Sequence, residues 1–257
     1  MQRTRALLTL AFAAICAAGC GRSAEPVPPA APTARPAAEP AAATVAPAPP
    51  VAAPAGAAAA VATPALSGEV IVAFLGDSLT AGFGLDPEQA FPHLVHKALA
   101  AEGFKVQVVN AGISGDTSAG GLARTDWLLK RKPDVLVVSL GANDGLRGMA
   151  LASTEKNLRG ILAKGREAGA RMLLIGMMIP PNYGPEYTTG FAAIYPKLAK
   201  EFEIPLLPFL LEGVAGRREL NQADGIHPTA AGHEILARTV LEAVRPLVRE
   251  AAAGKSR

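Results

Sequence analysis

Short apolar runs alternate with amphipathic stretches from about residue 70 to residue 248. Apolar runs rich in β-branched residues predict buried parallel strands, whereas apolar positions three and four apart predict helices. The expected strands are 70–75, 105–109, 134–140, 171–178 and a short, proline-bounded edge strand at 205–208. The expected helices are 88–101, 117–130, 153–168 with Ser153 as N-cap, 190–202 and 229–248. This alternation predicts an α/β fold, with a parallel sheet covered by helices on both faces.

The N-terminal part of the chain has a different character. Arg3 and Arg5 precede an apolar stretch, residues 6–18, that suits a secretory signal but is too short to cross a bilayer as a helix. Small residues follow it, as they do before a signal-peptide cleavage site. We therefore expect residues 1–19 to be a signal peptide and the protein to be exported.

Cys20 follows the small residues, and the segment resembles a bacterial lipobox, in which the cysteine is lipidated and becomes the first residue of the mature protein. Ala17 stands where such boxes usually carry leucine, so an ordinary signal peptide with an incidental cysteine is the alternative. Gly21 is not the aspartate that resembles an inner-membrane retention signal. We expect a periplasmic protein, anchored to the outer membrane through acyl chains on Cys20.

The rest of the chain divides into a linker, one domain and a tail. Residues 20–67 are mostly alanine and proline. These residues offer little surface to bury and few backbone donors, so they predict a disordered linker. One folded domain is expected over 68–250, a length sufficient for a full hydrophobic core. Residues 251–257 are expected to form a disordered tail.

The composition excludes several kinds of function. The formal net charge is +3, and no block of lysine and arginine is interleaved with aromatic residues, so we expect no nucleic-acid partner. Both cysteines, Cys16 and Cys20, are N-terminal, which leaves the folded domain without a disulfide or a cysteine-based metal site. His93 and His96 lie on one predicted helix without a third ligand, so we expect no metal.

Four short segments carry chemically useful side chains, and three of them follow predicted strands. The segments are 76–80 (GDSLT), 110–116 (NAGISGD), 141–144 (GAND) and 224–228 (DGIHP). Ligands of open α/β sheets bind beyond the carboxyl ends of the strands. We therefore expect these segments to gather at that edge of the sheet.

Together the segments predict a serine nucleophile with its acid–base pair. A serine hydroxyl is a weak nucleophile until a base takes its proton. His227 can serve as that base for Ser78, and Asp224, on the same loop, can orient the imidazole. The expected donors to an oxyanion are the backbone N–H groups of Ser78 and Gly115 and the side-chain amide of Asn143. Taken alone, Ser78 could merely cap a helix and Asn143 could shape a turn.

For several further residues we expect a structural role rather than a chemical one. Asp77 and Asp144 are expected to hold loops by hydrogen bonds. Trp127 is expected to pack in the core, and His233 to lie on a helix surface. Residues 180–187 are expected to border a substrate pocket, with an inert surface loop as the alternative.

These motifs resemble the SGNH (GDSL-type) hydrolases, and within them the thioesterase I / lysophospholipase / arylesterase group. The resemblance covers roughly residues 70–248, with further similar stretches at 181–184 and 193–202. It implies a three-layer α/β/α fold with a five-stranded parallel, flavodoxin-like sheet. It also implies cleavage of acyl esters and thioesters without a cofactor.

The resemblance also implies roles for the site residues. Ser78 would be the nucleophile, His227 the base, Asp224 its partner, and Gly115 and Asn143 oxyanion donors. The leading hypothesis is a secreted, lipid-anchored serine esterase that acts on small acyl esters, thioesters or lysophospholipids. A carbohydrate O-deacetylase of the cell envelope is the alternative enzyme. A catalytically silent envelope-binding lipoprotein is the alternative of another class.

Overall fold

The computed structural model describes residues 69–255. The expected signal peptide at 1–19, the linker at 20–67 and Cys20 therefore lie outside the described residues. Within the described range, no helix combines the length and the apolar character needed to cross a membrane.

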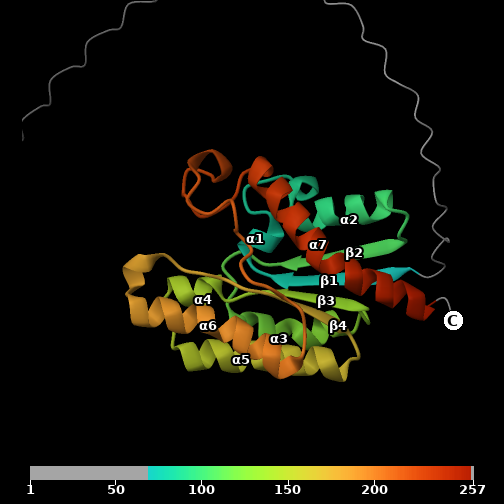
Figure 1. Cartoon of the computed structure of the whole chain (residues 1–257), viewed down its shortest axis with the longest axis horizontal. Coiled ribbons are helices and arrows are strands. Elements are labelled where there is room, and N and C mark those ends of the chain that lie inside the picture. The colour runs from blue at the N-terminus through green and yellow to red at the C-terminus, as the bar shows by residue number, and fades with distance from the viewer. Residues whose placement is uncertain (1–68, 256–257) are drawn as a thin grey trace, which may run out of the picture. The chain divides into compact units, whose positions relative to one another are not determined.

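The centre of the domain is a five-stranded parallel sheet (Figure 1). Its strands are β1 (Val70–Gly76), β2 (Val106–Gly112), β3 (Val135–Ser139), β4 (Arg171–Ile175) and β5 (Leu206–Leu207). They lie in the order β2-β1-β3-β4-β5, which is the flavodoxin-like order. Gly76, at the end of β1, pairs with Gly112 of β2 and with Ser139 of β3, so these three neighbouring strands end level with one another.

Helices cover both faces of the sheet. The helices are α1 (Ser78–Ala81), α2 (Phe91–Ala101), α3 (Ser118–Leu129), α4 (Ala142–Leu146), α5 (Leu151–Glu167), α6 (Pro185–Phe202) and α7 (Ala230–Lys255). Short 3-10 turns are η1 (Pro87–Gln89), η2 (Pro181–Tyr183) and η3 (Arg218–Leu220). Helices α2 and α7 pack together on one face, while α3, α5 and α6 form the layer on the other (Figure 1). The three-layer α/β/α fold is thereby confirmed.

The two-sided cover explains why β1 and β3 are almost continuously apolar. All five residues of β3 are buried, as are six of the seven in β1. A strand of a parallel sheet has helices against both of its faces, so it cannot alternate apolar and polar positions. The resulting core fixes the carboxyl ends of β1, β2 and β3, from which three of the four motif segments extend.

Some expected boundaries are wrong. The tail at 251–257 is not disordered throughout, because α7 continues to Lys255 and buries Ala251 and Ala252. Ser153 is not an N-cap. Helix α5 begins two residues earlier, and its N-cap is Ala150, which makes no side-chain cap hydrogen bond.

Two other elements also differ in length from the expectation. Helix α6 begins at Pro185 rather than at residue 190, since proline is well accommodated in the first turn of a helix. Strand β4 ends at Ile175, three residues before the expected end at 178.

Two side chains lie where the sequence did not place them. Trp127 is 56% exposed, with the Arg131 guanidinium 5.5 Å from the centre of its ring. His233 is buried rather than on a helix surface, and its Nδ1 accepts a hydrogen bond from the Phe91 N–H at 3.1 Å. A buried imidazole needs such a partner, and burial lowers the pKa of His233 to about 4.

Candidate active site

Ser78 lies at the sharp turn between β1 and α1. Asp77 is the N-cap of α1, and its carboxylate accepts a hydrogen bond from the Leu79 N–H at 3.0 Å. The turn depends on Gly76, because a Cβ there would lie 1.9 Å from the Thr80 hydroxyl oxygen. Because Gly76 has no side chain, α1 can fold back against the end of β1. The turn presents the Ser78 hydroxyl at the carboxyl edge of the sheet.

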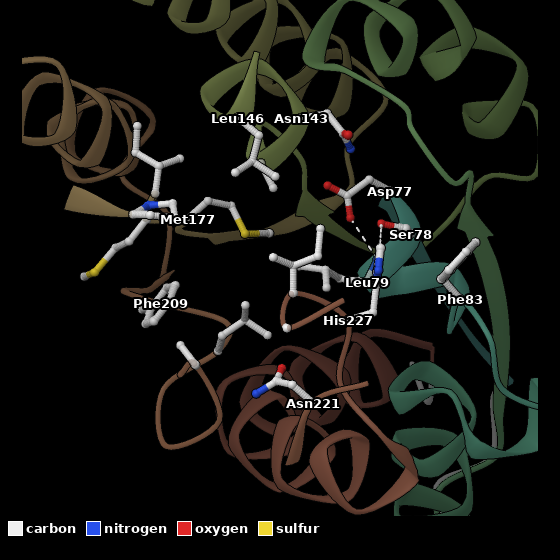
Figure 2. A pocket seen from close by; sticks show the side chains of 18 of the residues that line it. Asp77, Ser78, Leu79, Phe83, Asn143, Leu146, Met177, Phe209, Asn221 and His227 are labelled. Atoms are coloured by element: carbon white, nitrogen blue, oxygen red, sulfur yellow. Dashed lines mark hydrogen bonds between the residues drawn. The ribbon is translucent and has the colours of Figure 1, made fainter. Parts of the chain in front are cut away.

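The loop before α7 brings His227 to Ser78, although 149 residues separate the two (Figure 2). Asp224 comes from the same loop. His227 Nε2 lies 2.9 Å from Ser78 Oγ, and His227 Nδ1 lies 2.7 Å from Asp224 Oδ2. The three expected catalytic side chains therefore form one hydrogen-bonded chain.

Asp224 is held as an anion. The pKa of Asp224 is lowered to about 2, mainly by the side-chain hydrogen bond with His227. Hydrogen bonds from the backbone N–H groups of His227 and Ile226 lower it further. An ionised Asp224 accepts a hydrogen bond from Nδ1–H, which leaves Nε2 free to accept a hydrogen bond from the Ser78 hydroxyl. This is the tautomer that a general base needs.

Gln222 holds the histidine loop against the segment that follows the nucleophile. Its backbone N–H donates to the carbonyl oxygen of His227 at 2.7 Å. Its side-chain amide donates to the carbonyl oxygens of Phe83 at 2.7 Å and of Pro228 at 3.0 Å. The Phe83 ring in turn lies 4.5 Å from the His227 ring, between centroids. The sequence motifs gave no indication of Gln222 or Phe83 in this part of the site.

The other two expected oxyanion donors, Gly115 and Asn143, line the same cavity as Ser78. Gly115 has a φ of +79°, a conformation that favours glycine, and its carbonyl oxygen accepts a hydrogen bond from Arg147 Nη2 at 3.0 Å. Asn143 lies in the first turn of α4, and Figure 2 shows its amide directed toward the cavity above Ser78. Arg147, which the sequence did not single out, steadies the glycine loop.

Asp77 and Asp144 hold loops by hydrogen bonds, as expected. Asp144 accepts hydrogen bonds from the backbone N–H and the hydroxyl of Ser118 and from the Thr154 hydroxyl. These bonds connect α4 to the starts of α3 and α5. They fix the loop that carries Asn143.

Asp77, next to Ser78, has an incompletely satisfied carboxyl group. Its side chain is fully buried, and one carboxylate oxygen has no hydrogen-bond partner among the described residues. Burial raises the pKa of Asp77 to about 7, although the Leu79 N–H and the nearby His227 act in the opposite direction. With a pKa of about 7, the Asp77 carboxyl gains or loses its charge near neutral pH, directly beside Ser78.

A cavity of about 650 Å³ opens beside Ser78. Its apolar walls are Leu79, Leu146, Met177, Met178, Ile179, Pro180, Pro181, Phe209, Leu211 and Ile226. Part of the stretch 180–187 thus borders the pocket, as expected. The hydroxyls of Tyr183 and Tyr187 instead donate to the carbonyl oxygens of Leu146 and Met149, both at 2.6 Å, and so tie this segment to α4.

The described residues hold no group of three or more His, Cys, Asp or Glu side chains that could bind a metal ion. His93 and His96 lie on α2 with ring centroids 6.1 Å apart, and they share no further ligand.

The protein has a flavodoxin-like sheet, with a hydrogen-bonded Ser–His–Asp chain and an apolar cavity at the carboxyl edge. This combination indicates an ester hydrolase. The sequence model of the GDSL-like Lipase/Acylhydrolase family matches residues 74–235, and the chain belongs to this family. It is a carboxylic ester hydrolase of that family. The resemblance drawn from the motifs is confirmed.

Individual relatives agree with this assignment. Esterase TesA from Pseudomonas aeruginosa is 49% identical over 175 residues, which cover 68% of this chain and 87% of the relative. Thioesterase 1/protease 1/lysophospholipase L1 from Escherichia coli is 46% identical over 68% of this chain and 83% of the relative. The crystal structure of TesA superposes with a TM-score of 0.67 at 48% identity, covering 69% of this chain and 99% of that one.

Proposed function

We propose that the protein is an acyl esterase and thioesterase in which Ser78 attacks the substrate, His227 acts as general base and Asp224 orients it. The observation that carries the proposal is the hydrogen-bonded chain from Asp224 through His227 to Ser78, which opens onto an apolar cavity. This geometry supports Ser78 as a nucleophile, His227 as a base within hydrogen-bond distance of it, and the cavity as a place for an acyl chain.

The reaction proceeds through an acyl-enzyme. His227 Nε2 takes the Ser78 proton as Oγ bonds to the carbonyl carbon, and the negative charge moves to the carbonyl oxygen. The N–H groups of Ser78 and Gly115 and the amide of Asn143 stabilise that oxyanion. His227 then gives its proton to the departing alcohol or thiol. A water molecule, deprotonated by His227, attacks the acyl-enzyme and releases the acid and free Ser78.

The cavity favours acyl chains longer than acetyl. At about 650 Å³ it falls within the usual range of small-molecule pockets, and most of its lining side chains are apolar. A polysaccharide O-deacetylase has an acetyl group to bind and polar sugars to contact, for which this lining is poorly suited. The names of the relatives include esterase, thioesterase and lysophospholipase, which supports acyl esters, thioesters and lysophospholipids as substrates.

We also propose that the protein is exported and anchored through Cys20 to the outer membrane, facing the periplasm. The support is the N-terminal sequence: a basic start, a short apolar stretch and small residues before the cysteine. The following segment, rich in alanine and proline, would serve as a tether between anchor and catalytic domain.

The test is hydrolysis of an acyl-chain series of p-nitrophenyl esters and acyl thioesters by the wild type and by Ser78→Ala. We expect Ser78→Ala to lose at least about a thousandfold in kcat while its circular dichroism spectrum is unchanged. Ser153→Ala, a change of an exposed serine on α5, is the control and should behave as wild type. A fluorophosphonate should label the wild type and the control but not Ser78→Ala. Equal turnover in Ser78→Ala would refute the mechanism, and a folded wild type that is neither labelled nor active would support the silent lipoprotein.

A further inference from the structure

A second cavity, of about 380 Å³, adjoins the catalytic cavity. The two share Gly216, Asn221 and Gly225 as walls. The remaining described residues that line the second cavity are Arg217, Arg218, Gln222 and Ala223. This lining contains two arginines and no carboxylate, in contrast to the apolar walls of the catalytic cavity.

Of the polar side chains in this lining, Arg218 is the one without an internal partner. Arg217 forms an ion pair with Glu219 at 2.9 Å. The Asn221 amide donates to the carbonyl oxygens of Val214 and Arg217, and the Gln222 amide is engaged as described above. Within residues 69–255, the exposed Arg218 guanidinium has neither an ion pair nor a side-chain hydrogen bond. Its charge is therefore available to a ligand.

The chemistry of the reaction places the leaving group on this side. His227 must give its proton to the departing oxygen or sulfur, so the leaving group faces the imidazole. The loop that carries His227 also supplies Asn221, Gln222 and Gly225 to the second cavity. Figure 2 shows Asn221 and Asn143 on opposite sides of His227, so the second cavity lies away from the expected oxyanion donor.

We propose that the second cavity binds a phosphate group carried by the leaving alcohol or thiol, and that Arg218 is its principal contact. The inference rests on the function proposed above. Guanidinium groups match the geometry of phosphate oxygens with two parallel N–H donors, and they remain charged at every working pH. The phosphate can belong to a lysophospholipid headgroup or to coenzyme A, and the cavity recognises the chemistry that the two share.

The test uses pairs of substrates that differ in the phosphate. The ester pair is a 1-monoacylglycerol and the same molecule with a 3-phosphate; the thioester pair is an acyl-N-acetylcysteamine and the acyl-coenzyme A of equal chain length. For each pair, kcat/KM is measured below the critical micelle concentration, and the ratio of phosphorylated to neutral substrate is compared among variants. The ester arm and the thioester arm thereby distinguish the two sources of phosphate.

We expect Arg218→Gln to lower this ratio about fivefold in at least one arm, mainly through KM, because the contact is partly exposed to water. Added salt should lower the wild-type ratio and have less effect on the variant. Arg218→Lys should keep part of the preference. Arg238→Gln, which removes an exposed arginine of α7, is the matched control and should leave the ratio unchanged.

Two results would overturn the inference. The first is a ratio that Arg218→Gln and Arg238→Gln leave equally unchanged in both arms. The second is a wild type that hydrolyses the neutral substrates but neither phosphorylated one. In both cases turnover of the neutral esters, absent in Ser78→Ala, would leave the proposed function standing. A wild type that hydrolyses none of the substrates would instead refute both the proposed function and the proposed subsite.

Discussion

Replacement of Asp77 by asparagine tests the cost of a buried carboxyl beside the nucleophile. Asp77→Asn keeps an oxygen that can accept the hydrogen bond from the Leu79 N–H, and it removes the charge. The charged groups that act on Asp77 are His227 and Asp116. Both are the same in the variant, so a comparison at equal pH isolates the carboxyl.

The direction and size of the effect follow from the pKa. Below the ordinary value of 3.8 the carboxyl is protonated in both the folded and the unfolded chain. Between 3.8 and about 7 the unfolded chain ionises while the folded chain stays protonated, so the folded state loses stability as the pH rises. Above about 7 the loss is complete and constant, and it amounts to about 4 kcal/mol at 1.36 kcal/mol per pH unit. Asp77→Asn lacks this loss.

The measurement is urea-induced unfolding of wild type and Asp77→Asn at pH values from 3.5 to 8.5. Circular dichroism is the suitable signal, because the single tryptophan, Trp127, is half-exposed in the folded state. We expect the free energy of unfolding of the variant, relative to wild type, to rise by about 4 kcal/mol between pH 3.5 and pH 8. Glu88→Gln, a change of an exposed carboxyl, should show no such rise. A difference between Asp77→Asn and wild type that does not vary with pH would refute the reasoning.

Two further predictions concern the loop that carries Asn143 and the N-terminal anchor. Gly141→Ala puts a methyl group 2.3 Å from the Tyr195 hydroxyl oxygen at a φ of +111°, so it should lower both kcat and the melting temperature. Gly148→Ala, with a φ of +61° and no atom within 4 Å of the new Cβ, should lose only about 1 kcal/mol of stability, and equal losses in the two variants would contradict the packing argument. Cys20→Ser should move the protein from the membrane fraction to the soluble fraction on cell fractionation; an unchanged distribution would rule out a lipid anchor.

The sequence was most informative at positions where a single physical requirement determines the residue type. Continuous β-branched runs predicted the sheet because a strand covered on both faces must be apolar throughout. Gly76 and Gly115 stand where a Cβ or an ordinary φ would disrupt the loops next to Ser78. The spacing of Asp224 and His227 predicted an acid–base pair because both side chains come from one short loop, and the structure brings that pair to Ser78.

The failures concern side chains whose environment is set by distant segments. His233 is polar and helical, yet it is buried because the start of α2 offers it the Phe91 N–H. Trp127 is large and apolar, yet it faces outward and packs against Arg131. Neither Gln222 nor Arg218 belongs to a recognisable motif, since their surroundings exist only after the loop before α7 has folded. Hydrophobic periodicity reports on neighbouring residues of one helix or strand, so it cannot predict contacts between segments that are distant in the sequence.

The site consists of two parts with different mechanical support. Ser78, Gly115 and Asn143 extend from strand ends or adjoining turns fixed by the core, whereas Asp224 and His227 lie on an exposed loop outside it. That loop is joined to the nucleophile segment by the Gln222 side chain and anchored at its base by a bridge between Asn221 and Pro228.

His227 is therefore aligned with Ser78 by a few hydrogen bonds near the surface, each of modest strength. In the proposed mechanism the leaving group lies at this loop rather than at the core. If the proposed subsite exists, a change at Arg218 alters the selection of leaving groups without disturbing Gln222, the strand ends or the expected oxyanion donors. Under the proposed function, the loop before α7 supplies the base and the contacts to the leaving group, while the sheet edge supplies Ser78 and the expected oxyanion donors.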